Sequence, residues 1–225
     1  MYEKIQDMFV AARNSKVIGT WRVGTVTDRI VLADTPFLAI SDSIIVYQEV
    51  VPHIDTTNEL EWKESAFEKF IFALEEILKE AFKRRIFLRG GISYGEAIIR
   101  LDPQIREHII LGNPYLEAVE IEKTQSWMGI AFHPSLKEYL ERTRHRSWLV
   151  EYQIPKKKDY RDLELPNITI GWVDSSLEPY RAIFDEWVTE TKHHNEIKKN
   201  TLKFFNDCLE RPPRIMGLEV DLRRI

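Results

Sequence analysis

The chain has 225 residues, 44 % of them hydrophobic and 30 % charged, which is typical of a folded globular protein and excludes disordered and collagen-like classes. Its single cysteine, Cys208, excludes an intrachain disulfide and a thiolate metal cluster. No leader-like segment and no apolar run of membrane-spanning length is found, so we expect a cytoplasmic protein without a membrane partner. The net charge of −4 disfavours nucleic acid as a partner, because phosphate backbones attract basic surfaces.

The first fifty residues predict a helix followed by a β-hairpin. Apolar residues recur every three or four positions over residues 1–13, the spacing of an amphipathic helix. Residues 16–35 permit no assignment. The apolar runs 37–40 and 44–47 then flank Ser41-Asp42-Ser43, which predicts two strands with Ser-Asp as their turn.

The middle of the chain predicts a long helix and three strands. Apolar residues at helical spacing mark residues 60–84, with Asn58 as the N-cap. Residues 86–99 read as a strand, a glycine-containing centre and a second strand, and residues 108–112 as another strand. Asn113 then caps a short helix in which Pro114 takes the first helical position.

The remaining residues predict alternating strands and helices and then a helical tail. The tail, over residues 180–209, reads as two helices. We therefore expect one domain over residues 1–175 and a helical C-terminal extension over residues 176–225. The other expected elements are strands over 127–132, 147–154 and 167–174 and a helix over 134–143.

Three motifs occur in order between residues 37 and 132: an "SDS" hairpin, "RGGISYGE", and "GNPYLEAVEIE" at the start of a helix. Together they resemble the catalytic domain of class III nucleotidyl cyclases, and most of all the bacterial branch that contains the pyrimidine cyclases of Pycsar anti-phage systems. Each motif alone is weakly specific. The positions that carry the resemblance are Ser41, Asp42, Ser43, Arg89, Gly90, Gly91, Ile92, Ser93, Gly95, Glu96, Gly112, Glu117, Ala118 and Glu122.

The resemblance implies an α+β fold, a ferredoxin-like βα sandwich, which dimerises head to tail and binds a nucleoside triphosphate at the homodimer seam. The implied reaction is attack of the ribose 3′ oxygen on the α-phosphate with loss of pyrophosphate. Two divalent ions held by carboxylates assist such reactions, and Mg²⁺ or Mn²⁺ suits oxygen ligands. The cyclic nucleotide, cUMP or cCMP, would act on a downstream effector in phage defence.

The resemblance also assigns roles to single residues. Asp42 is the implied catalytic and metal-binding carboxylate; the alternative is that it accepts hydrogen bonds from surface turn amides. Arg89 either contacts phosphate or pairs with Glu96. The implied substrate-binding set is Ser41, Ser43, Arg89, Arg106, Asn113 and Glu117. For Trp127 and His133, which follow the third motif, we expect core or edge packing.

The chain also departs from the family pattern. The family's first metal-binding aspartate has no match upstream of Asp42, which leaves a truncated active cyclase and a degenerate homologue as alternatives. Leu116 and Glu120 stand where purine cyclases place Asn and Arg. Ala39 stands at the position of the lysine that reads adenine, which favours the pyrimidine branch.

Two functions of different classes therefore stay open. The first is a metal-dependent cyclase, and the second is a catalytically silent cyclase-like module that dimerises or binds nucleotide. An RNA-binding ferredoxin-like domain is a remote third alternative, because the chain is acidic and lacks an aromatic-rich RNA-binding strand.

Overall fold

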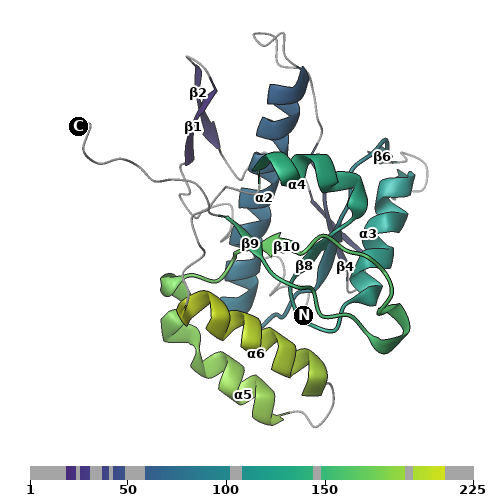
Figure 1. Cartoon of the computed structure of the whole chain (residues 1–225). Coiled ribbons are helices and arrows are strands. Elements are labelled where there is room, and N and C mark those ends of the chain that lie inside the picture. Colours follow the sequence, from purple (N-terminus) through teal and green to yellow (C-terminus); the bar gives the residue numbers. More distant parts are fainter. Residues whose placement is uncertain are drawn as a thin grey trace. The chain divides into compact units, whose positions relative to one another are not determined.

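The protein combines helices and strands, as the α+β prediction requires (Figure 1). The computed structural model describes residues 19–23, 26–30, 37–40, 43–48, 59–101, 108–143, 148–190 and 195–210. The chain divides into two compact units, Met1–Ile86 and Phe87–Ile225. The predicted boundary at residues 175–176 lies inside the second unit. The predicted helix over residues 1–13 lies outside the described residues.

The first unit contains two antiparallel hairpins. Strands β3 (Phe37–Ile40) and β4 (Ser43–Val46) confirm the predicted hairpin, with Ile40 paired to Ser43. Strands β1 (Gly19–Val23) and β2 (Val26–Ile30) form the other hairpin. It falls in the stretch that the sequence left unassigned, where a two-residue connection beginning with Gly24 was the available signal.

Helix α2 (Glu59–Lys83) confirms the helix predicted over residues 60–84. The chain ends it with a paired-carbonyl cap, in which Arg85 N–H donates to Phe82 O and Ile86 N–H to Ala81 O, both at 2.9 Å. Arg85 adopts φ 62°, the left-handed conformation that this type of cap needs. The apolar stripe of the helix is buried at Phe67, Ile71, Ala73, Leu74, Ile77, Leu78, Ala81 and Phe82.

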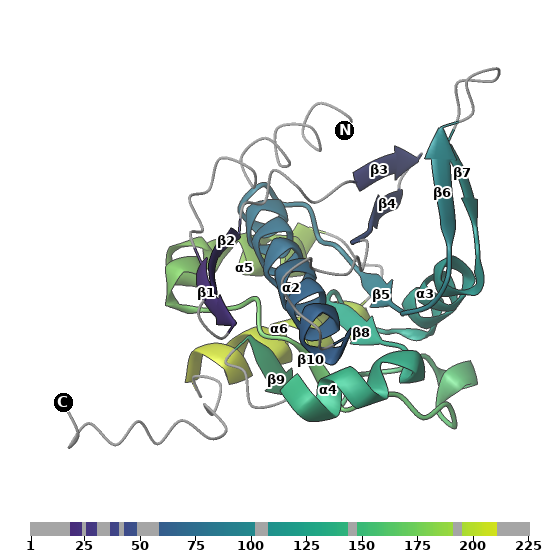
Figure 2. The ribbon, with the colours of Figure 1, turned by 90° about the horizontal axis from the view of Figure 1, so that it is seen from above.

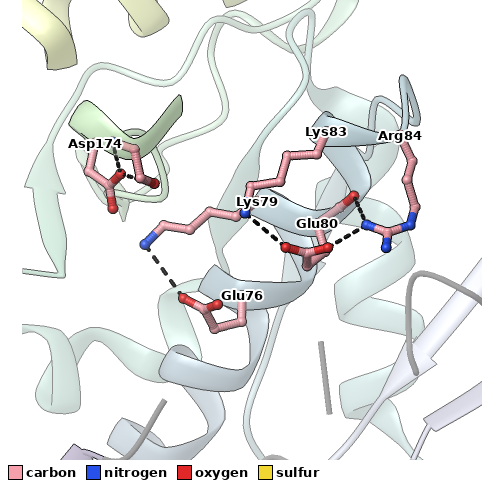
Figure 3. A network of polar contacts seen from close by, with 7 residues as sticks. Glu76, Lys79, Glu80, Lys83, Arg84 and Asp174 are labelled. Atoms are coloured by element: carbon pink, nitrogen blue, oxygen red, sulfur yellow. Dashed lines mark hydrogen bonds and ion pairs between the residues drawn. The ribbon is translucent and has the colours of Figure 1, made fainter. Parts of the chain in front are cut away.

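The polar side of α2 carries ion pairs between residues one turn apart (Figure 3). Lys79 Nζ lies 2.6 Å from Glu75 Oε1 and 3.5 Å from Glu76 Oε1, and Lys83 Nζ lies 2.8 Å from Glu80 Oε1. Burial alone would raise the pKa of Glu80, but the hydrogen bonds and charges of Lys83 and Arg84 outweigh it and lower that pKa. Such pairs at i, i+3 and i, i+4 support the helix.

The core of the second unit is built on four strands that lie side by side in the order β5 (Gly90–Ile92), β8 (Ile130–Phe132), β10 (Ile168–Ile170) and β9 (Leu149–Glu151). β5 runs parallel to β8, and β10 lies beside β8 and pairs antiparallel with β9. Thr169 Oγ1 donates to Ile130 O at 2.6 Å and so joins β10 to β8. The prediction of a strand before the glycines was wrong, because β5 consists of the glycines themselves and Ile92.

Strands β6 (Ile98–Leu101) and β7 (His108–Leu111) form an antiparallel ribbon beside α3 (Asn113–Thr124), which follows β7 directly (Figure 2). Ile98 pairs with Leu111, and their side chains are 57 % and 56 % exposed. β6, β7 and α3 agree with the predicted elements. The helix predicted over 134–143 is a 3₁₀ turn, η2 (Pro134–Leu136), continued by α4 (Lys137–Thr143).

The C-terminal helices pack on the same core as the strands. After the 3₁₀ segments η3 (Lys158–Tyr160) and η4 (Ser175–Tyr180), α5 (Ala182–Glu190) and α6 (Asn195–Glu210) lie side by side (Figure 1). The Phe204 ring of α6 meets the buried Trp127 ring edge to face, with centroids 4.9 Å apart. Asn200 Nδ2 donates to Ser126 O at 2.8 Å. The two predicted helices are confirmed, and so is core packing of Trp127.

Candidate functional site

The second and third motifs fold against one another as strand β5 and helix α3. A Cβ on Gly91 would overlap Ala118 O, closer than side-chain carbon atoms approach a backbone oxygen, and would lie in tight contact 3.1 Å from Glu122 N. The glycine at this position therefore permits the helix to lie directly on the strand. One residue of the second motif and two of the third meet at this contact.

The segment between β5 and β6 meets the beginning of α3 in the same way. Gly112, the residue before α3, has φ 142°, and a Cβ there would lie 2.6 Å from Glu96 O. A Cβ on Gly95 would lie 2.8 Å from Pro114 Cγ. Ser93 Oγ donates a short hydrogen bond to Pro114 O. Glycines of both motifs thus stand where the two segments leave no room for a side chain.

Arg89 forms a partly buried ion pair with Glu122. Its Nε and one terminal nitrogen both lie 2.5 Å from Glu122 Oε1, and its other terminal nitrogen donates to Gln125 O at 3.4 Å. The predicted pairing with Glu96 is therefore wrong, because α3 brings Glu122 to the guanidinium. The pair joins the first residue of the second motif to the last residue of the third.

The sequence analysis did not predict the buried hydrogen-bond network around the Gln125 side chain. Gln125, which is fully buried, donates from Nε2 to Gly90 O at 2.8 Å and to Ile121 O at 3.1 Å. Its Oε1 accepts from Trp127 Nε1 at 2.9 Å. All the hydrogen-bonding atoms of this side chain are thereby used, which a buried amide requires. A neutral amide next to a helix end gives no sequence signal of burial.

Glu117, His133 and Ser135 gather at the carboxyl ends of β5 and β8. His133 Nδ1 lies 3.3 Å from Glu117 Oε2, 3.0 Å from Ser135 Oγ and 3.2 Å from Ser135 N. Such strand ends are a common place for ligand sites in α/β proteins. Both the hydroxyl and the carboxylate approach the same ring nitrogen, however. A hydroxyl–imidazole–carboxylate relay needs both ring nitrogens, so this cluster is not one.

Asn113 is exposed and is the first residue of α3; its predicted role as the helix cap is wrong. Gly112 takes that place and makes no side-chain capping bond, because the chain needs positive φ there. Asn113 lies two residues after the end of β7, and its side chain is exposed. Its implied contact with substrate stays a prediction.

The remaining predicted site residues are described only in part. Asp42, Ser41 and Arg106 lie outside the described residues. Ser43 begins β4 opposite Ile40. The implied metal ligand is thus not among the described residues, and within the described ranges no three His, Cys, Asp or Glu side chains gather to hold a metal ion.

The comparisons with known proteins add no assignment: no family model, no curated protein and no solved structure matches the chain. Among the helices of the described residues, none combines the length and the apolar character needed to cross a bilayer.

Proposed function

We propose that the chain is a nucleotidyl cyclase of the ferredoxin-like α+β type, which converts a nucleoside triphosphate into a 3′,5′-cyclic nucleotide and pyrophosphate. One observation supports this proposal most. The second and third motifs, which residues 97–111 separate in sequence, contact one another at the motif positions themselves: Gly91 against Ala118, and Arg89 with Glu122. A chance likeness has no reason to place its matching residues in one contact.

The chemistry requires that the ribose 3′ oxygen attacks the α-phosphorus, forming one P–O bond while the bond to pyrophosphate breaks and the hydroxyl proton leaves. Asp42 would hold Mg²⁺ or Mn²⁺, which neutralises charge on the phosphates. Residues near the start of α3 would orient the substrate, with Asn113 exposed there. A second copy of the chain would complete the site, as the family resemblance implies.

The second candidate is a silent cyclase-like module that binds nucleotide or dimerises. The internal ion pairs favour it. Arg89, the described cation of the motifs, is paired with Glu122, and Glu117 faces His133. Charges used in this way stabilise the fold and are not directed at a triphosphate. The two candidates agree on the fold and differ in turnover.

The test is incubation of the full chain with each of ATP, GTP, UTP and CTP in Mn²⁺ and in Mg²⁺, with mass-spectrometric detection of cyclic nucleotide. The cyclase proposal predicts a cyclic product with UTP or CTP as the best substrate. Triphosphate binding in calorimetry without product from any of the four overturns it in favour of the silent module. Absence of both binding and product overturns the cyclase proposal and the nucleotide-binding form of the silent module, and leaves dimerisation as that module's role.

A further inference from the structure

His133 is held between the ends of the two parallel strands. Its backbone N–H donates to Ile92 O at 2.7 Å, which fixes the residue beside the end of β5. Its side chain is 25 % exposed, so solvent reaches the imidazole. The ring touches two elements, α3 through Glu117 and η2 through Ser135.

Two neighbours make opposite demands on one atom of this ring. Ser135 N–H, 3.2 Å from Nδ1, needs that nitrogen unprotonated as an acceptor. Glu117 Oε2, 3.3 Å from Nδ1, needs it protonated as a donor. Glu117 Oε2 is buried and accepts no hydrogen bond in the structure, and a buried carboxylate oxygen without a donor is costly. Neither protonation state of the imidazole satisfies both neighbours.

Other polar groups around the ring do not resolve this conflict. Ser135 Oγ accepts from Tyr94 N–H at 3.1 Å, and it lies 3.0 Å from Nδ1, where it can donate or accept. The Tyr94 ring packs on Tyr139 of α4 with centroids 5.0 Å apart. Lys137 of α4 pairs with Glu141, 3.9 Å away. Within the described part of the chain, Glu117 is therefore the charged group in contact with the imidazole.

We propose that His133 is a proton-dependent latch between α3 and η2. The neutral ring, with its proton on Nε2, accepts from Ser135 N–H and caps η2. The protonated ring donates Nδ1–H to Glu117 and ties α3 to the end of β8, and it releases the Ser135 amide. Imidazoles change charge between about pH 8 and pH 5. Acidification thus exchanges one contact for the other, whether or not the chain turns over nucleotides.

The experiment is a pH titration of the full ¹⁵N-labelled chain, in which the His133 ring nitrogens and the Ser135 backbone amide are followed by NMR. The expected result is an unprotonated Nδ1 at pH 8, protonation of both ring nitrogens on acidification, and a Ser135 amide shift that follows the same curve. A ring that carries its proton on Nδ1 at pH 8 overturns the proposal. So does a Ser135 amide that does not respond when the ring is protonated.

Three variants separate the latch from a general packing effect. Glu117→Gln removes the charge at constant size, and the contact between the ring and α3 that forms on acidification is expected to weaken. Glu120→Gln, the same change at an exposed position of α3, leaves the titration unchanged. His133→Asn keeps an oxygen that can accept from Ser135 N–H and abolishes the amide titration. An unchanged contact between the ring and α3 at acid pH in Glu117→Gln contradicts the latch.

Discussion

The carbonyl oxygen of Ala118 occupies the space into which a side chain on Gly91 would project. Helix α3 therefore lies closer to β5 than it could if residue 91 had a Cβ atom. The contact explains why a glycine stands at position 91. Both residues belong to motifs that resemble those of nucleotidyl cyclases.

Gly91→Ala is expected to lower the free energy of unfolding by about 1 to 3 kcal/mol, the cost of overpacking a closed contact. Gly90→Ala is the matched control, because a Cβ there would meet Ile130 Cγ1 at 3.7 Å, an ordinary contact distance. Urea denaturation of both variants measures the difference. Equal midpoints for the two variants would mean that α3 does not lie on β5 as described.

The Arg89–Glu122 pair is expected to have a coupling free energy of about 0.5 to 1.5 kcal/mol, because it is partly buried and both nitrogens share one carboxylate oxygen. A double-mutant cycle with Arg89→Ala and Glu122→Ala measures this value. Lys137–Glu141 is the control pair, 3.9 Å apart with side chains 76 % and 61 % exposed, and should couple negligibly. Coupling of Arg89 to Glu96 instead would contradict the observed partner.

Thr201→Val tests whether α6 belongs to the strand core. Thr201 Oγ1, in a fully buried residue, accepts from Met128 N–H at 2.8 Å. Valine keeps the shape and leaves that amide unpaired, which should cost about 1 to 3 kcal/mol of unfolding free energy. Thr201→Ser restores the acceptor and should recover most of the loss. If valine unfolds like the wild-type chain, α6 is a separable extension, as the predicted domain boundary implies.

The buried Cys208 thiol is expected to make the folded state less stable at alkaline pH. Burial, and secondarily the charge of Asp207, raises the pKa of this thiol from 9.0 to about 12. The folded state therefore keeps a proton that the unfolded chain loses, so the contribution is complete below pH 9 and declines above it. The decline is at most about 1.4 kcal/mol per pH unit.

The measurement is urea denaturation between pH 8 and pH 10.5 of the wild-type chain and Cys208→Ala. The variant should show the shallower decline. Burial, and secondarily the charges of Asp207 and Cys208, also raises the pKa of Tyr152; both proteins keep the burial and Asp207, so the larger part of that contribution is common to them. Parallel pH profiles would show that the thiol titrates alike in the folded and unfolded states.

The sequence predicted those elements whose signal is local. Helix α2 repeats apolar residues at one period for 25 residues, and the β3–β4 hairpin places two apolar runs around a short turn. Strand β5 was misplaced because two of its three residues are glycines, which have low strand propensity. Its stability as a strand comes from parallel pairing with β8, about 40 residues away, and from α3, which no local pattern reports.

The candidate site divides in the same way. The motif positions themselves were visible in the sequence, and the structure brings those of the second and third motifs together. The partner of Arg89 was not predictable, because Glu96 and Glu122 are both acidic and only the fold selects between them. His133 was expected to pack at the core or an edge, and its contact with Glu117 depends on the approach of α3 to the end of β8.

The most direct measurement of the central claim is the rate of cyclic nucleotide formation by the Asp42→Asn variant in Mn²⁺, with Asp162→Asn, an exposed loop position, as the matched control. Loss of a metal-binding carboxylate should cost several kcal/mol of transition-state stabilisation, about a hundredfold or more in rate. We therefore predict a cyclic product from the wild-type chain and from Asp162→Asn, and at most about one hundredth of that rate from Asp42→Asn. Equal rates for the two variants, or no product from the wild-type chain, would contradict the cyclase proposal.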